Sequence, residues 1–171
     1  ASPDSLFVRG EGTLRFDRET KQVLVDGAAI ELEKAAVNEL ADSLSGRLIL
    51  SGHPEYDTVR KVWNGMHDKR PALIARCSGA GDVQQAVTFA RERDLLVAVR
   101  GGGHSWPCKS VCDSGIMIDL AELTDVQVDT AKMHAHTQGG ALLGHLDTAA
   151  LAHGMVTTAG VVSHTGVGGF T

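Results

Sequence analysis

The chain has 171 residues, of which 43% are hydrophobic and 22% are charged, so it is long enough to bury a core and is not composed like a disordered segment. The formal net charge is −5 and there is no long basic run, which argues against nucleic acid as a partner. No apolar stretch approaches the roughly 20 residues that a membrane-spanning helix needs, so we expect no membrane partner either.

Cysteine and glycine usage give two further expectations. The three cysteines, an odd and small number, do not suit a disulfide framework and favour the cytoplasm. The first residues lack the charged head and apolar region of a signal peptide, and a secreted form whose signal has been removed is the alternative. The glycines gather in the second half of the chain, which indicates backbone that approaches something closely.

Residues 1–50 read as an N-terminal extension in which no catalytic pattern is visible. Segments 13–16 and 22–25 have strand-forming composition and are expected to pair with each other as a hairpin. Apolar residues at helical spacing predict a helix within residues 31–45. Beyond the extension, amphipathic spacing predicts another helix over residues 55–69.

A βαβ unit is expected over residues 72–99. Residues 72–75 form a short apolar strand, and the helix that follows has Asp82 in its first turn, where a negative charge suits the helix dipole. Residues 95–99 are a continuous apolar run, which is typical of a strand buried on both faces. Residues 116–120 are the expected third strand.

After residue 120 the pattern changes to an antiparallel pair of strands and a helix closed by Gly154. We therefore expect an α+β fold with two α/β subdomains, a parallel βαβ layer followed by an antiparallel sheet with helices. The expected divisions are an extension at 1–50, a first subdomain at 51–122 and the start of a second at 123–171. Because the chain stops inside a glycine-rich run, we expect it to be a piece of a longer polypeptide.

The strongest chemical signal is VRGGGHSWP at residues 99–107, directly after an expected buried strand. Consecutive glycines leave backbone N–H groups unshielded, and such runs bind anions. His104 lies at the exit of this loop. The motif is not a P-loop, because GxxxxGK[ST] is absent, and it is not GxGxxG, because its sixth position is Trp106. The alternative is an ordinary loop in which the histidine caps a turn.

A second glycine-rich segment, residues 157–170, alternates glycines with small apolar and polar residues. By itself it is a weak signal, since many surface loops look alike. Together with residues 99–107 it predicts the two walls that a long cofactor needs.

The chain resembles a known family in four segments, which are ALIARCSGAGDVQQAVTFARERDLLVAVRGGGHSW, CDSGIMIDLAELTDVQVD, QGGALLGHLD and TTAGVVSHTGVGGFT. They are similar to the PCMH-type FAD-binding domain of FAD-linked oxidases, in the vanillyl-alcohol oxidase superfamily and its berberine-bridge-enzyme-like branch. The resemblance runs from about Tyr56 to the end of the chain, and residues 1–50 match poorly.

The resemblance implies FAD in a cleft between two subdomains, attached covalently through His104 to the flavin 8α-methyl. It implies that residues 100–105 hold the pyrophosphate and that residues 160–169 line the second side of the cofactor. A cysteine that makes a second bond to the flavin in some members is replaced by Val162, so a single attachment is expected. The implied cofactor contacts are Arg100, Gly101, Gly102, Gly103, His104, Ser105, Gly160, Val161, Ser163, His164, Gly166 and Val167.

The family takes a hydride from a small organic substrate at a C–H next to oxygen or nitrogen. The resemblance places the substrate domain in the remainder of the same polypeptide, together with the catalytic base, which this sequence does not identify. The alternative function is a flavin-binding module without turnover of its own.

The remaining candidates have weaker support. His134 and His136 lie on the same face of an expected strand, and together with His145 they are a conceivable metal site. The favoured interpretation is an exposed strand face, and no metal is expected. Cys108 lies close to His104 in sequence and is flagged for flavin proximity. Trp63 is expected to pack in the core. Trp106 is expected to pack against the βαβ layer, with shielding of the flavin as the alternative.

Overall fold

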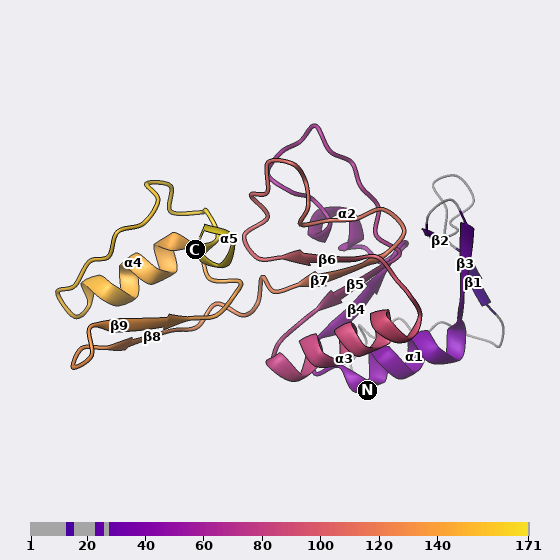
Figure 1. The fold of residues 1–171 in the computed structure, drawn as a ribbon, viewed down its shortest axis with the longest axis horizontal. Helices are drawn as coiled ribbons and strands as arrows, with labels where there is room; N and C mark the ends of the chain where they lie inside the picture. Colours follow the sequence, from indigo (N-terminus) through magenta and orange to yellow (C-terminus); the bar gives the residue numbers. More distant parts are fainter. Residues whose placement is uncertain (1–12, 16–22, 26–27, 171) are drawn as a thin grey trace.

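The computed structural model describes residues 13–15, 23–25 and 28–170. It contains three sheets spread along the long axis of the molecule, with the N-terminal strands at one end and the β8–β9 hairpin at the other (Figure 1). A four-stranded sheet with helices on both faces lies between them. In this part of the chain no helix is long and apolar enough to cross a membrane.

The N-terminal strands are β1 (Thr13–Arg15), β2 (Val23–Val25) and β3 (Ala28–Glu33). The expected hairpin between the first two is wrong, because β1 and β2 each pair antiparallel with β3 in the order β1-β3-β2. Only residues 26–27 separate β2 from β3, and such a short link makes these two strands neighbours. Phe16 and Gln22 lie outside the described residues.

The central sheet has the order β4-β5-β7-β6. Its strands are β4 (Arg47–Leu50), β5 (Leu73–Arg76), β6 (Val97–Arg100) and β7 (Ile116–Asp119). β5, β7 and β6 run parallel, and β4 is antiparallel to β5. The expected βαβ unit is present, but β7 lies between its two strands.

Alternate side chains of the sheet enter two cores, as the pleat requires. Helices α1 (Lys34–Ser43) and α3 (Ala80–Glu92) cover one face (Figure 1). The other face packs against the short helix α2 (Tyr56–Val59) and the segment that follows the first glycine loop. Cys108 is fully buried in this second core, with Ile74 and Met117 of the sheet.

Asp82 joins α3 to the preceding chain. Its buried carboxylate accepts hydrogen bonds from the backbone N–H groups of Ser45 (2.8 Å), Gly46 (3.1 Å) and Ser78 (2.7 Å). Burial acts to raise the pKa of this carboxyl, but the hydrogen bonds to its charged form prevail and hold the pKa below the ordinary value. The expected place of Asp82 in the first helical turn is confirmed.

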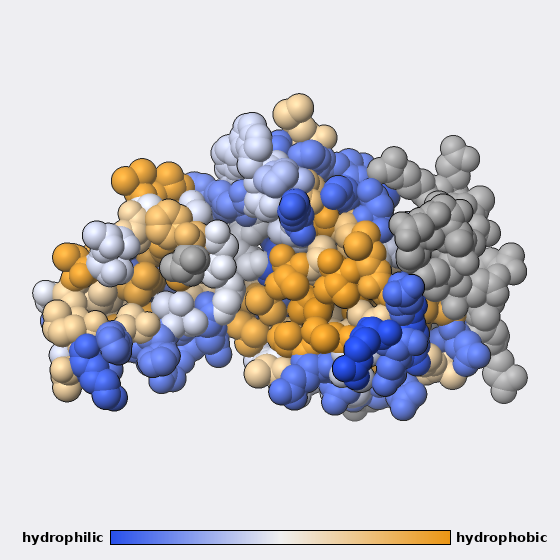
Figure 2. Space-filling model, viewed as in Figure 1, coloured by the Kyte–Doolittle hydropathy of each residue, from blue (hydrophilic) through white to orange (hydrophobic). Residues whose placement is uncertain are grey.

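Strand β6 differs from the expectation of a strand buried on both faces. Val97 and Val99 are 40% and 52% exposed, and only Ala98 is buried. The reason is position, since β6 is an edge strand and α3 packs over β5 and β7. Figure 2 shows an apolar patch near the middle of the molecule. Val87 of α3 is also an exposed apolar side chain, at 47%.

The predicted helix over residues 55–69 is also wrong in extent, because α2 ends at Val59. The next residues turn away from a helical path. The Trp63 N–H donates to the carbonyl of Gly103 (3.0 Å) instead of to its own preceding turn. Tertiary contact with the first glycine loop therefore overrides the amphipathic pattern.

The last part of the chain is a separate layer, with the antiparallel strands β8 (Val126–Asp129) and β9 (His134–Thr137) packed on α4 (Leu143–Leu151). The expected strand pair and helix are confirmed. Gly154 has a φ of +66° and donates to the carbonyl of Leu151, which is the predicted helix end.

Candidate functional site

Two glycine loops meet between the central sheet and the last layer. The first, residues 101–105, leaves the end of β6, and the second, residues 160–169, leads into the short helix α5 (Val167–Phe170). A Cβ added to Gly102 would lie 2.5 Å from the Cα and N of Gly166. The loops therefore touch backbone to backbone, and side chains at these two positions would separate them.

A third segment, for which the sequence predicted no contact with the glycine loops, completes the junction. Gly139 follows β9, and a Cβ on Gly101 would lie 2.6 Å from its carbonyl oxygen. A Cβ on Gly168 would lie 2.9 Å from the same oxygen. The signal that could have revealed this wall was the Gly139-Gly140 pair within the QGGALLGHLD segment.

A cleft of about 500 Å³ opens along this junction. That volume lies within the range of about 300–1,000 Å³ of small-molecule sites. Of the expected contact residues, those that line it are Gly101, Gly102, Gly103, His104, Ser105 and Gly166. Lys109, Ser110, Leu120 and residues 168–170 complete the walls.

The first loop presents its backbone to the cleft. Within the described residues, no backbone N–H of residues 101–104 donates a hydrogen bond to another protein group. Gly103 has a φ of +72°, a left-handed conformation that glycine adopts without strain. Successive unbonded N–H groups in such a turn form a concave site for an anion.

His104 is held between two rings at the edge of the cleft. The Trp63 ring stacks on the imidazole with centroids 5.6 Å apart and planes inclined by 20°. The His164 ring lies at 5.0 Å and 50°. Burial lowers the pKa of His104, and the charge of His164 acts in the same direction, while the backbone of His164 opposes it. The neutral imidazole, whose ring nitrogen has a free lone pair, is therefore favoured.

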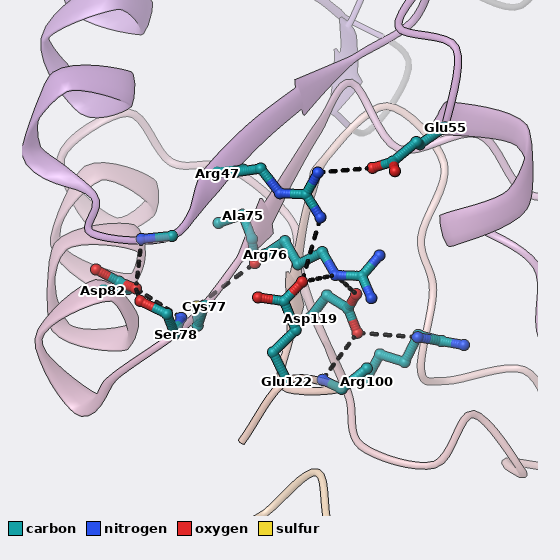
Figure 3. A network of polar contacts seen from close by, with 12 residues as sticks. Arg47, Glu55, Ala75, Arg76, Cys77, Ser78, Asp82, Arg100, Asp119 and Glu122 are labelled. Atoms are coloured by element: carbon teal, nitrogen blue, oxygen red, sulfur yellow. Dashed lines mark hydrogen bonds and ion pairs between the residues drawn. The ribbon is translucent and has the colours of Figure 1, made fainter. Parts of the chain in front are cut away.

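Arg100, expected to contact the cofactor, turns back toward the sheet. Its guanidinium Nη1 donates to Oδ1 of Asp119 (2.9 Å), which is fully buried on the neighbouring strand. Figure 3 shows Arg76 approaching the same carboxylate from β5, at 3.8 Å. Glu122 pairs in turn with Arg76 at 2.8 Å. The Arg100 charge thus anchors the start of the first loop.

The other expected contacts of the second loop lie outside the cleft. Val167 is buried in the core beside α4, where its N–H donates to the carbonyl of Ala141 (2.8 Å). Gly160 lies against Leu143. Val161 is fully exposed, and the carbonyl of Ser163 accepts from the N–H of Gly144 (2.8 Å). A second cavity, of about 290 Å³, separates β9 and α4 from residues 155–159.

The structure also locates the tryptophans and histidines that had weaker support as functional residues. The expectation that Trp63 packs in the core is wrong, since it is 58% exposed, and Trp106, at 67% exposed, is not buried against the βαβ layer either. His134 and His136 lie exposed on β9, as favoured from the sequence. His145 is engaged elsewhere, its Nδ1 accepting from the N–H of Leu142. Across the described ranges, no group of three or more potential metal ligands is present.

Comparison with known proteins agrees with this geometry. A family model described as an FAD binding domain matches residues 71–171. (R)-6-hydroxynicotine oxidase of Paenarthrobacter nicotinovorans is 35% identical over 119 residues, which are 70% of this chain and 26% of that protein. An FAD-linked oxidoreductase of Dictyostelium discoideum is 37% identical over 136 residues, or 79% of this chain and 30% of that protein.

A solved structure of an oxidoreductase relative is similar to this chain in both sequence and fold. Wild-type BBE-like 1 of Physcomitrella patens matches with a TM-score of 0.72 and 27% identity, over 77% of this chain and 29% of that one. The expected α+β architecture of the PCMH type is confirmed, and the chain spans 26% to 30% of the length of these relatives. The chain belongs to the FAD binding domain family of the FAD-linked oxidoreductases, which includes berberine-bridge-enzyme-like proteins.

Proposed function

We propose that this chain is the flavin-binding part of an FAD-dependent oxidoreductase that takes a hydride from a C–H next to oxygen or nitrogen of a small organic substrate. The observation that supports this most is the cleft between the two glycine loops, with the unbonded N–H groups of residues 101–104 beside it. It has the backbone donors that a pyrophosphate requires and an imidazole at its edge.

The residues present fit a dinucleotide. A Cβ at Gly101 or Gly102 would meet the backbone of Gly139 or Gly166, so side chains at these positions would push apart the segments that form the cleft. The N–H groups of the first loop would donate to phosphate oxygens, and Lys109 on the same cleft would add a positive charge. Arg100 would act indirectly, by fixing the loop through Asp119.

FAD supplies the hydride acceptor, and the protein supplies binding and orientation. His104 is the proposed point of attachment, because its imidazole lines the cleft at the end of the first glycine loop and its lowered pKa favours the neutral, nucleophilic form. Joining the imidazole nitrogen to the flavin 8α-methyl would remove one C–H hydrogen and the N–H hydrogen. It would therefore be a two-electron oxidation, with the two protons and two electrons passing to an external acceptor such as dioxygen.

A single attachment is proposed. Val162 occupies the position from which a cysteine would form the second bond, and a valine has no nucleophile. Cys108 is fully buried in the core, so it does not replace that cysteine. We further propose that the substrate domain and the catalytic base belong to the remainder of the polypeptide, since the relatives are more than twice as long as this chain.

The test is made on the full-length protein. We expect it to show flavin absorbance that stays with the polypeptide after acid precipitation, because a covalent bond survives unfolding. His104→Ala should retain FAD in the native state and release it in acid, whereas the control His136→Ala, on the exposed face of β9, should behave like the unmodified protein. Flavin that acid removes completely from the unmodified protein would exclude the attachment. If the protein binds flavin but no substrate reduces it, the alternative function would be favoured, which is a flavin-binding module without catalytic turnover.

A further inference from the structure

Residues 60–70, between α2 and β5, form a strap against the first glycine loop. Its base is fixed by Arg60, which is only 7% exposed. The Arg60 guanidinium donates to Asp57 (2.7 Å), to Asp68 (2.5 Å) and to the carbonyl of Lys69 (3.1 Å). A buried cation with this number of acceptors holds both ends of the strap in place.

The strap is bonded to the loop that contains His104 at successive points. The Trp63 N–H donates to the Gly103 carbonyl (3.0 Å), and Nδ2 of buried Asn64 donates to the Trp106 carbonyl (3.1 Å). Farther along, Nζ of Lys69 donates to the Cys108 carbonyl (3.0 Å). These bonds fix the backbone on both sides of His104.

One side chain of the strap contacts the imidazole itself. The Trp63 indole stacks on His104 although 58% of the Trp63 residue remains exposed. An aromatic side chain that is exposed in this way adds little to a core, so burial alone does not account for its position. The stack instead restricts the rotation of the imidazole and excludes water from one of its faces.

From these contacts we infer that Trp63 is a positioning residue, which holds the His104 imidazole in the orientation that reaches the cofactor. This inference rests on the proposed attachment at His104. Trp63 takes no part in the bond itself. His164 flanks the imidazole from the second loop, and Lys109 is the other titratable side chain on this cleft.

The experiment compares full-length variants incubated with FAD over a range of pH, with the acid-stable flavin measured over time. Misplacing a reacting group lowers a rate by roughly 10–100-fold, which is the expected loss for Trp63→Ala. Trp63→Phe keeps a ring on the imidazole and should recover most of the rate. The control is Trp106→Ala, which removes another exposed indole (67% against 58%). Its ring lies 6.1 Å from the Trp63 ring but has no ring contact with His104 among the described residues.

The pH profile separates positioning from a general loss of structure. Removing the indole lets water reach the imidazole, so the pKa of His104 should rise toward its ordinary value. The pH at half-maximal attachment should then move upward in Trp63→Ala and stay in place in Trp106→Ala. A profile and rate unchanged in Trp63→Ala would overturn the positioning role alone. Unmodified protein without acid-stable flavin would overturn the attachment, and the inference with it.

Discussion

Gly102 and Gly166 come from two loops on different layers of the molecule, and each leaves space for the backbone of the other. A Cβ on Gly102 would lie 2.5 Å from Gly166, and one on Gly166 would lie 2.5 Å from the Gly102 nitrogen. The same contact joins the central sheet to the β8–β9 layer beside the cleft. The shape of the cofactor site therefore depends on the absence of two side chains.

Gly102→Ala should weaken this junction. The added methyl meets backbone atoms that cannot rotate away, so the loops must separate, at a cost of about 1–3 kcal/mol in the free energy of unfolding. FAD retention should fall more steeply than stability, because the cleft itself is deformed. Thermal unfolding and flavin content measure the two effects. Gly65→Ala is the control, since a Cβ there meets nothing within 4 Å and Gly65 does not line the cleft; equal losses in both variants would contradict the argument.

Asp119→Asn should destabilise the base of the first loop. The substitution leaves the Arg100 guanidinium, only 19% exposed, without its carboxylate. Breaking a buried ion pair costs about 3–5 kcal/mol, because the remaining charge stays poorly solvated. Denaturant unfolding measures the loss. The control is Lys132→Ala, which breaks the exposed pair with Asp129 and should change stability little. Similar stability of Asp119→Asn and the unmodified protein would show that the pair does not anchor the loop.

Asp82→Asn should change how stability depends on pH. The folded-state pKa of Asp82 is lowered, so its carboxylate stabilises the protein above the ordinary carboxyl pKa of about 4, and this stability is lost as the pH falls through the folded value. At neutral pH the variant should lose about 1–3 kcal/mol, the value of hydrogen bonds to a charged group. In acid the difference should disappear.

The check is unfolding by denaturant at several pH values. Asp42→Asn is the control, because Asp42 is an exposed aspartate on α1. A stability difference between Asp82→Asn and the unmodified protein that is the same at every pH would show that the charge of Asp82 is not what holds α3 to residues 45–46.

Much of the fold was accessible from local patterns. The strand at β5 follows from a short continuous apolar run, and α3 with Asp82 in its first turn follows from an apolar period of 3.6 residues. The β8–β9 pair follows from two strand-forming segments joined by a turn. The two glycine loops were also visible, because runs of glycine are rare in regular elements. These features depend on residues that are close in sequence, so the amino-acid sequence of this one protein is enough to predict them.

Other features had no local signal. The exposed apolar face of β6 follows from its place at the sheet edge, and an apolar run by itself does not state which strand will lie beside it. The strap at residues 60–70 has helical spacing but bonds to Gly103 instead. The pairing of Arg100 with the buried carboxylate of Asp119 on the next strand also had no local signal, while its expected contact with the cofactor stays a prediction.

The sequence by itself determined the family, the two glycine loops and the histidine at the end of the first, since each is a matter of residue type and spacing. Only the tertiary structure decided which loop contacts which, that Gly139 completes the junction and that Trp63 stacks on His104. The physical reason is that these contacts join segments far apart in the chain. Their formation depends on packing and on the pairing of buried polar groups, which no local pattern encodes.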